Sequence, residues 1–279
     1  MAPDKSRKNI GYTRQKNRES VKKCKEYDSY EDNTDILEGR NPVLEALKSD
    51  RSINKILIAK GDREGSINQI IALAKEKRVV VQEVEKKKLD NMSESFRHQG
   101  VIALTAIKDY VEVDDILKVA KDRGEAPFLV ILDGIKDSYN LGSILRTADA
   151  VGAHGVIIPK RRAVGLTPLV SKASAGAVEY VPVARVTNIV QTIEYLKKEN
   201  IWVVGTDLSG EQPFYKSNLE GSIALVIGSE GEGMSRLTTE SCDFVVKIPM
   251  KGQISSLNAA VAGAIVLYEI SKQRENTGR

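Results

Sequence analysis

Long hydrophobic runs and cysteine pairs are both missing from this 279-residue sequence. No segment reaches the roughly 18–20 apolar residues of a membrane-spanning helix; the longest candidate, LNAAVAGAIVLYEI at 257–270, is alanine-rich and predicts a buried helix. The two cysteines, Cys24 and Cys242, cannot build a disulfide framework. The first residues, MAPDKSRKN, lack the apolar core of a signal peptide. We therefore expect a cytoplasmic protein with no membrane segment.

Metal-ligand motifs are absent as well. Neither the C-x-x-C nor the H-E-x-x-H spacing occurs, so the sequence predicts no metal. Histidine is scarce, with only His98 and His154. A function that depends on a metal or on a histidine-rich site is therefore not expected.

Positive charge is gathered at the start of the chain. The chain has 42 basic and 38 acidic residues, and residues 1–25 contain nine of the basic and two of the acidic ones. The rest of the chain therefore has 33 basic and 36 acidic residues. Residues 1–33 are polar and aperiodic, and we expect a disordered basic tail. Such an arm can hold a polyanion by releasing counterions, or it can be a solvated leader that aids solubility. Both interpretations stay open.

The rest of the chain predicts two α/β units. Residues 34–106 form the first, a compact unit whose order begins near Ile36 and whose first helix, 39–47, has Asn41 as its N-cap. Further helices are expected at 66–77 and 87–93, and strands at 55–59, 79–84 and 98–106. A charged linker, 107–126, leads to the second unit.

The second unit, 127–279, alternates short β-branched runs with helices. This pattern predicts a mostly parallel sheet covered on both faces. The strands are expected at 128–133, 155–159, 181–186, 201–207, 224–228 and 244–249, and the helices at 141–153, 167–175, 188–199, 235–240 and 256–271. The carboxyl ends of parallel strands are where ligands collect in such sheets.

Unusual polar residues follow three of these strands. Asn140 and Arg146 come after the strand at 128–133, SEGEGMSR (229–236) after 224–228, and MKGQISSLN (250–258) after 244–249. If the sheet is parallel, these turns lie along one edge. We expect them to form one site; three unrelated turns are the alternative.

The middle turn, LVIGSEGEGMSR (225–236), has the glycines of a phosphate-binding loop without its lysine. Glu230 and Glu232 would repel a polyphosphate, so a neutral or cationic ligand with an adenine is the better candidate. S-adenosylmethionine meets this description, because its sulfonium is positive and it carries no phosphate. The alternative is that both glutamates are solvated turn residues.

Three ordered motifs resemble the signatures of the SpoU (TrmH) family, which are RNA ribose 2′-O-methyltransferases of the SPOUT superfamily. They are N-x-G-x-x-x-R at 140–146, IGSEGEGM at 227–234 and IPMKGQISSLNAAVAGAIVLYE at 248–269. GRNPVLEAL (39–47), HQGVIA (98–103) and the stretch 159–186 are closer to the subgroup that methylates a guanosine of 23S rRNA. The resemblance covers about residues 36–271, so the tail lies outside it.

The resemblance implies a fold and an assembly that periodicity does not. It implies a deep trefoil knot in the second unit, a ribosomal-protein L30e-like RNA-binding first unit, and a homodimer. It also implies S-adenosylmethionine as the cofactor and 23S rRNA as the partner. A tRNA 2′-O-methyltransferase, a resistance-type rRNA adenosine methyltransferase and a non-catalytic RNA-binding or ribosome assembly factor are the alternatives.

Two groups of site residues follow from the motifs. The resemblance implies that the cofactor is bound by backbone groups and apolar walls. The candidates that it implies are Thr206, Gly228, Ile248, Met250 and Leu257, and we add Gly231 from the same glycine-rich turn. The glycines could be plain turn residues, and Ile248 and Leu257 could be core residues. The catalytic candidates are Asn140, Arg146, Glu230, Ser256 and Asn258.

Arg146 matches the family's catalytic arginine. Because a guanidinium stays protonated, we expect it to hold a phosphate and stabilise a developing alkoxide rather than act as a base. Alternatively, it only pairs with Glu230 to join two loops. Ser256 could lie on the proton path or cap the last helix, and Asn140 and Asn258 could orient substrate or be caps.

A basic stretch in the second unit predicts contacts with RNA phosphates. The candidates are Lys160, Arg161, Arg162 and Lys172, with Arg40 and Asn41 in the first unit. A solvated surface cluster is the alternative. His98 is expected to face RNA or cap a strand, and His154 to lie in a surface turn.

Overall fold

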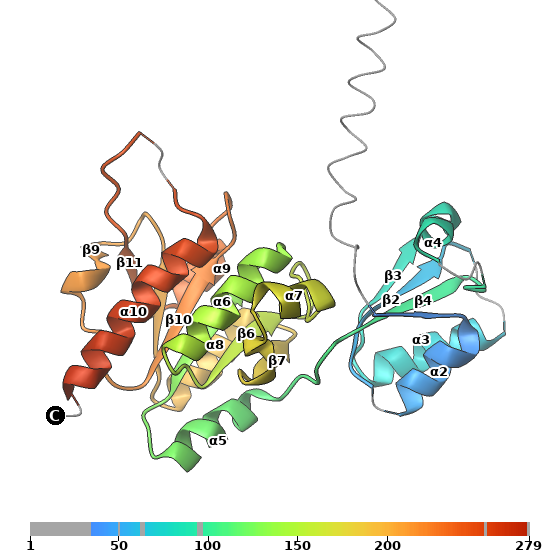
Figure 1. Ribbon diagram of the computed structural model, residues 1–279, viewed down its shortest axis with the longest axis horizontal. Helices are drawn as coiled ribbons and strands as arrows, with labels where there is room; N and C mark the ends of the chain where they lie inside the picture. The colour runs from blue at the N-terminus through green and yellow to red at the C-terminus, as the bar shows by residue number, and fades with distance from the viewer. Residues whose placement is uncertain (1–34, 50, 62–64, 94–96, 254–255, 278–279) are drawn as a thin grey trace, which may run out of the picture. The chain divides into compact units, whose positions relative to one another are not determined.

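The computed structural model describes residues 35–49, 51–61, 65–93, 97–253 and 256–277. The predicted basic tail lies outside them. The described residues form an α/β protein with two sheets, as predicted (Figure 1). No helix among the described residues is long and apolar enough to cross a membrane. The two-domain division and its boundaries stay a prediction.

The first sheet has four strands in the order β1-β4-β2-β3. β4 (Val101–Thr105) is antiparallel to β1 (Asp35–Glu38) and β2 (Ile53–Ala59), and β3 (Val81–Val84) is parallel to β2. Strand alternation sends Ile56 and Ile58 to one face and Leu57 to the other. The first face packs on the helices α2 (Arg40–Lys48) and α3 (Ser66–Glu76), and the second on α4 (Lys86–Met92).

One prediction for this part of the chain was wrong, and one helix was not predicted. The helix α2 begins at Arg40, and its N-cap is Gly39 at φ 95°, not Asn41. The expected linker, 107–126, contains the helix α5 (Val113–Arg123), whose capping box joins Glu112 and Asp115. Its apolar stripe is narrow, with Ile116 and Ala120 buried, so its many charges hid a helical pattern.

The second sheet has seven strands in the order β7-β6-β5-β10-β8-β11-β9, and every neighbouring pair is parallel. This confirms the predicted mostly parallel sheet. The strands are β5 (Phe128–Asp133), β6 (Gly155–Pro159), β7 (Val183–Val186), β8 (Trp202–Thr206), β9 (Gln212–Pro213), β10 (Ile223–Gly228) and β11 (Phe244–Lys247). The chain places β10 between β5 and β8, so strand order departs from sequence order. The knot stays a prediction.

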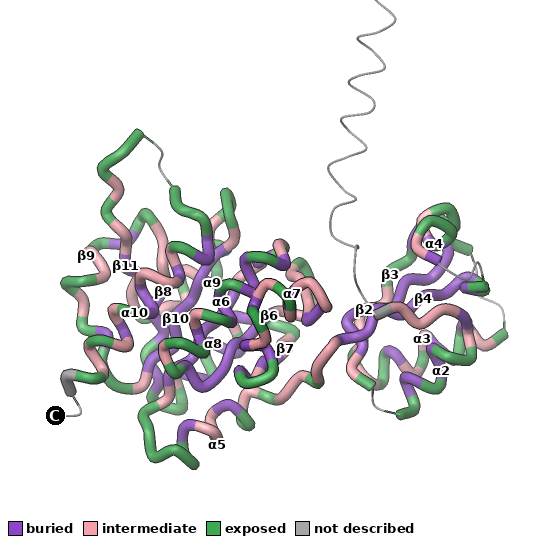
Figure 2. The backbone as a smooth tube through the Cα atoms, in the orientation of Figure 1, coloured by how far each residue is buried: buried purple, intermediate pink, exposed green. Residues whose placement is uncertain are grey.

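Helices cover both faces of this sheet (Figure 1). One face of β5 and β10 packs on α6 (Ser138–Ala150), α7 (Pro168–Ala173) and α10 (Ala259–Thr277). The other face packs on α5 and α8 (Ile189–Lys198), and Lys197 of α8 donates to the Ser241 carbonyl at the end of α9 (Arg236–Ser241). Two 3-10 turns, Ala177–Glu179 and Phe214–Lys216, complete the fold. Burial on both faces explains the unbroken apolar runs of the central strands (Figure 2).

Both histidines have structural partners. His154 is fully buried, not in a surface turn: its Nδ1 accepts from the Phe128 N–H at 2.9 Å and its Nε2 lies 3.0 Å from Glu125. His98 is also buried; its Nδ1 accepts from the Gly100 N–H just before β4, and its Nε2 lies 2.9 Å from Asp90. Of the two roles expected for His98, capping a strand is the one that this hydrogen bond supports.

Candidate active site

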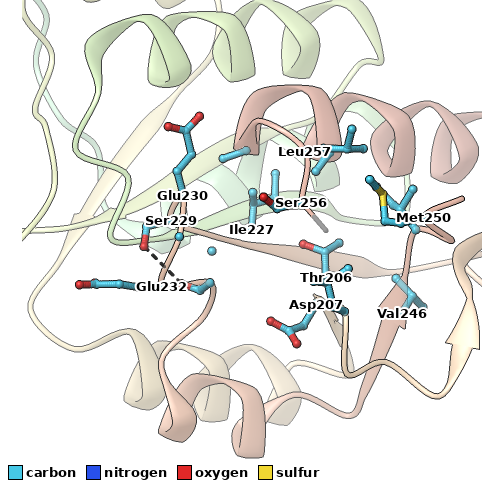
Figure 3. A pocket seen from close by; sticks show the side chains of 17 residues that line it. Thr206, Asp207, Ile227, Ser229, Glu230, Glu232, Val246, Met250, Ser256 and Leu257 are labelled. Atoms are coloured by element: carbon cyan, nitrogen blue, oxygen red, sulfur yellow. Dashed lines mark hydrogen bonds between the residues drawn. The ribbon is translucent and has the colours of Figure 1, made fainter. Parts of the chain in front are cut away.

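A cavity of about 460 Å³ lies at the carboxyl ends of β8, β10 and β11 (Figure 3). We call it the donor cavity. The turns that follow these three strands form its walls, together with the start of α10. All six residues predicted to bind a cofactor line it: Thr206, Gly228, Gly231, Ile248, Met250 and Leu257. Glu230 and Ser256, from the catalytic group, line it as well.

The turn after β10 is shaped by its glycines. Ser229 and Gly233 exchange backbone hydrogen bonds of 3.0 and 2.9 Å, which fold the chain back on itself. Gly231 and Gly233 have φ of +81° and +67°, a region that side chains disfavour. A Cβ on Gly228 would lie 2.2 Å from the Gly233 carbonyl carbon. Only glycine at 228 therefore allows this close turn beside the cavity.

The remaining walls are apolar side chains and one hydroxyl. Ile227, Val246, Ile248, Met250 and Leu257 line the cavity. The Thr206 hydroxyl donates to the Val226 carbonyl at 2.9 Å, so its hydrogen is used within the sheet. Leu257 is 36% exposed, which argues against a role as a core residue. Flat apolar walls beside backbone amides are suited to a heteroaromatic ligand.

Asp207 is a cavity residue that sequence reasoning missed. It follows Thr206 at the end of β8, and its Oδ1 accepts from the Ser209 N–H at 2.9 Å and the Ser209 hydroxyl at 2.7 Å. Figure 3 shows Thr206 and Asp207 on the opposite side of the cavity from Ser256 and Leu257. The available signal was a carboxylate at the end of a fourth strand of the same edge, beside the three strand ends singled out in the sequence.

The charge of the donor cavity is negative. Its lining includes the carboxylates of Asp207, Glu230 and Glu232, and no lysine, arginine or histidine among the described residues. The Lys136 ammonium lies 3.9 Å from Glu232, but both side chains are largely exposed, so solvent screens this pair. A cationic or neutral ligand matches this lining better than a phosphate.

Three predicted catalytic residues meet in one hydrogen-bonded cluster. Glu230 Oε1 accepts from Asn140 Nδ2 at 3.0 Å and from Asn258 Nδ2, which also donates to Asn140 Oδ1 at 2.8 Å. Asn258 Oδ1 accepts from the N–H groups of Ala260 and Val261 at 3.0 and 3.1 Å and so caps α10. The cluster joins the starts of α6 and α10 to the turn after β10.

Arg146 and Ser256 lie outside this cluster. Arg146 is exposed on α6, and its guanidinium has no partner among the described residues, so it does not pair with Glu230. Ser256 is exposed at the edge of the donor cavity, and the α10 cap is Asn258 instead. Both side chains are therefore available to a ligand or substrate.

The predicted RNA contacts are spread over several elements. Arg40, in α2, donates through Nε to the Gln99 carbonyl at 3.0 Å, and its neighbour Asn41 is exposed. Arg161 and Arg162 are exposed after β6, and Lys172 is exposed on α7. Lys160 is half-buried in a different cavity. None of them lines the donor cavity.

Cysteine chemistry is not supported by the described residues. Cys242 is half-buried, and burial followed by the neighbouring Asp243 raises the pKa of its thiol to about 12. At neutral pH the thiol is therefore protonated and a poor nucleophile. Cys24 lies outside the described residues.

Two family models match the chain. Residues 127–268 match the SpoU rRNA methylase family, and residues 36–111 match a family described as RNA 2′-O ribose methyltransferase substrate binding. YacO of Bacillus subtilis (strain 168), whose name assigns it to the TrmH family of tRNA/rRNA methyltransferases, is 52% identical over 246 residues, which cover 88% of this chain and 98% of YacO.

Solved structures are similar as well. The SpoU methyltransferase AviRb from Streptomyces viridochromogenes, in complex with AdoMet, is 26% identical with a TM-score of 0.56, covering 86% of this chain and 90% of AviRb. The TrmH/SpoU tRNA modifying enzyme of A. aeolicus is 31% identical with a TM-score of 0.51, covering 59% of this chain and 85% of that one.

Proposed function

Because the chain belongs to the SpoU family of RNA methylases, we propose that it transfers a methyl group from S-adenosylmethionine to a ribose 2′-hydroxyl of RNA, most specifically a guanosine of 23S rRNA. One observation carries this proposal. The six residues assigned to the cofactor from the sequence line a single cavity, and that cavity contains three carboxylates and no cation among its described residues.

S-adenosylmethionine fits the donor cavity in size and in charge. The volume, about 460 Å³, lies within the range of small-molecule sites, roughly 300–1,000 Å³. Ile248, Met250 and Leu257 would pack on the adenine, and the backbone at Gly228 permits close approach. The negative charge of the Asp207 carboxylate would attract the cationic part of the ligand. Bound S-adenosylmethionine supplies an electrophilic methyl group whose departure leaves a neutral thioether.

In the proposed reaction, the ribose oxygen forms a bond to the methyl carbon as the carbon–sulfur bond breaks. Much of the rate comes from holding the two reactants in line. Arg146, permanently protonated and exposed, holds the adjoining phosphate and stabilises the charge that develops on the oxygen. Ser256 passes the hydroxyl proton towards water. The Asn140–Glu230–Asn258 cluster fixes the turns that carry these groups.

The choice of 23S rRNA over tRNA is supported by the first sheet and by the stretch 159–186. Incubation with labelled S-adenosylmethionine and separate rRNA and tRNA pools, followed by mapping of the methylated ribose, tests it. Label on a guanosine of 23S rRNA is expected. Label on tRNA or on an rRNA adenosine would select one of those substrates instead, and no label on any RNA would favour a non-catalytic RNA-binding role.

We also propose that the enzyme is a homodimer through α6 and α10. Val261 and Tyr268, seven residues apart on one face of α10, are 49% and 57% exposed, and Tyr139 of α6 is 61% exposed. A helix with apolar residues on its buried and exposed faces is typical of one that is covered on both sides. A second copy of the chain is the occupant proposed here.

Sedimentation velocity of two variants tests the dimer. Val261→Lys places a charge on the proposed interface and should shift the protein from dimer to monomer. Leu237→Lys is the matched control, because Leu237 is 57% exposed on α9, away from this face. A monomeric wild type, or a dimer that Val261→Lys leaves intact, contradicts this assembly.

A further inference from the structure

A second cavity, of about 320 Å³, has a lining whose charged side chains are mostly positive. We call it the basic cavity. Its walls come from the segment before β2, the end of α3, the segment before α5, the end of β6, and β7. Five of its lining side chains are cations, and Glu112 is the single carboxylate among the described residues that line it. The cations are Arg51, Lys77, Arg78, Lys160 and Arg185.

Arg185 holds the walls of the basic cavity together. Its two terminal nitrogens donate to the carbonyls of Ile53 (3.1 Å), Asn54 (2.6 Å) and Lys160 (3.2 Å). Its guanidinium carbon lies 5.0 Å from the centre of the Tyr110 ring, a cation–π contact. These contacts join β7 of the second sheet to β2 of the first. The Nε atom is buried without a hydrogen-bond partner among the described residues.

Two further cations of this cavity have no partner for their charged ends among the described residues. They are Arg78, which is exposed, and Lys160, which is half-buried. Burial, and then the charges of Arg185 and Arg78, lower the pKa of Lys160, with Glu112 acting in the opposite direction. Crowded, partly desolvated cations oppose folding, and an anion between them would relieve the repulsion.

The position of Lys160 relates the basic cavity to the donor cavity. Ile157 of β6 and Val226 of β10 both pair with Ile131 of the intervening strand β5, so β6 and β10 end level, at Pro159 and Gly228. Lys160 follows β6 directly, and Gly228 lines the donor cavity. Two strand spacings separate these ends, roughly 10 Å. One nucleic-acid strand along this edge can therefore reach both places.

We propose that the basic cavity binds a backbone phosphate of the RNA substrate, a few nucleotides from the ribose that is methylated. Arg78 and Lys160 supply the charge, and Arg185 fixes the cavity that holds them. The ligand is a phosphodiester because five guanidinium and ammonium side chains line the cavity beside a single carboxylate, and such donors pair with phosphate oxygens. This inference rests on the proposed function and adds a contact that sets how RNA lies on the enzyme.

Arg78→Gly is the sharpest test. Arg78 has φ 54° just after α3, and the Val79 N–H donates to the Ala74 carbonyl at 2.8 Å, as in a helix-ending turn that favours glycine. Glycine there removes the charge and relieves the backbone, so the melting temperature should stay the same or rise. Weaker RNA binding in this variant cannot then be attributed to unfolding.

The measurement is binding of oligouridylate at several salt concentrations. Arg78→Gly and Lys160→Met should each weaken binding severalfold and make the slope of log affinity against log salt shallower by about 0.7, the value for one phosphate contact on a single strand. Lys118→Met, which removes an exposed cation of α5 outside the basic cavity, should leave the slope unchanged.

Two outcomes separate this inference from the proposed function. Slopes for Arg78→Gly and Lys160→Met equal to those of the wild type and Lys118→Met overturn the phosphate site and leave the methyltransferase proposal standing. A wild type that binds neither S-adenosylmethionine nor RNA overturns both. Unchanged calorimetric binding of S-adenosylmethionine by all three variants is expected, because none of the three residues lines the donor cavity.

Discussion

The donor cavity and the basic cavity differ in charge and in how they are built. Both contain apolar side chains, but the charged residues of the first are three carboxylates, and those of the second are five cations and one carboxylate. The donor cavity forms from turns at one edge of one sheet, whereas the basic cavity collects side chains from both sheets. In our proposal, each cavity has the charge opposite to that of its ligand. The negative donor cavity binds a cationic methyl donor, and the positive basic cavity binds the anionic RNA backbone.

The largest effect is expected from Arg146→Lys, which tests the group proposed to act between the two ligands. Replacement of a preorganised donor to a developing anion typically lowers kcat by about 10²–10³-fold. Single-turnover methyl transfer should fall by this order while the calorimetric affinity for S-adenosylmethionine is retained. Turnover equal to that of the wild type would remove Arg146 from the transition state.

Gly228→Ala tests whether the donor cavity depends on close backbone packing. The added methyl would lie 2.2 Å from the Gly233 carbonyl carbon and must displace the turn. The affinity for S-adenosylmethionine should fall at least about tenfold, or about 1.4 kcal/mol. Gly252→Ala is the matched control, because no heavy atom lies within 4 Å of its Cβ position. Equal affinities in the two variants would contradict the packing argument.

Asp207→Asn tests the charge of the donor cavity directly. The substitution keeps the shape of the side chain and removes its negative charge. The affinity for S-adenosylmethionine should fall about two- to fivefold, as for a partly exposed ion pair. The affinity for the neutral product, S-adenosylhomocysteine, should stay the same, which provides the control. Equal losses for both ligands would mean that Asp207 acts through shape and not through charge.

The smallest effect is expected from a substitution of His154, which should change the stability of the fold and leave both cavities unaffected. Burial is the largest cause that lowers its pKa below the usual 6.5, so the unfolded chain takes up the proton more readily. The neutral ring therefore contributes stability above about pH 6.5, and this contribution is lost as the pH falls below that value.

The variant for this prediction is His154→Asn, which keeps an acceptor for the Phe128 N–H. Urea unfolding midpoints of the variant should depend less on pH between about 5 and 8 than those of the wild type. An identical pH dependence in the two proteins would show that another group causes the loss at acid pH.

The sequence predicted the donor cavity because its determinants are local. Strand ends, glycine turns and the carboxyl-edge rule predicted that the turns after 128–133, 224–228 and 244–249 form one site, and the resemblance to the SpoU family implied Thr206, Gly228 and Ile248 as cofactor contacts. Asp207 escaped notice because a single acid after a strand resembles an ordinary turn residue. The hydrogen bonds around Glu230 could not be predicted from the sequence, because Asn140, Glu230 and Asn258 come from three separate segments that converge there.

The basic cavity could not be predicted in the same way. Arg78 and Arg185 are 107 positions apart in the sequence, and neither belongs to a motif. Arg78 follows α3, whereas Arg185 lies in β7 of the second sheet. Lys160 was predicted to bind RNA as one member of a surface run with Arg161 and Arg162; the structure instead half-buries it beside Arg185. The helix α5 was missed for a related reason, because its few apolar residues pack on the second sheet and form only a narrow stripe among its charges.

Calorimetric titration of the wild-type protein with S-adenosylmethionine, and in parallel with ATP, tests the central claim most directly. Both ligands contain adenosine, but one is cationic at sulfur and the other carries a polyphosphate. We predict saturable binding of S-adenosylmethionine at one site per chain and no competition by ATP. No heat with S-adenosylmethionine, or its displacement by ATP, would contradict the assignment of the donor cavity.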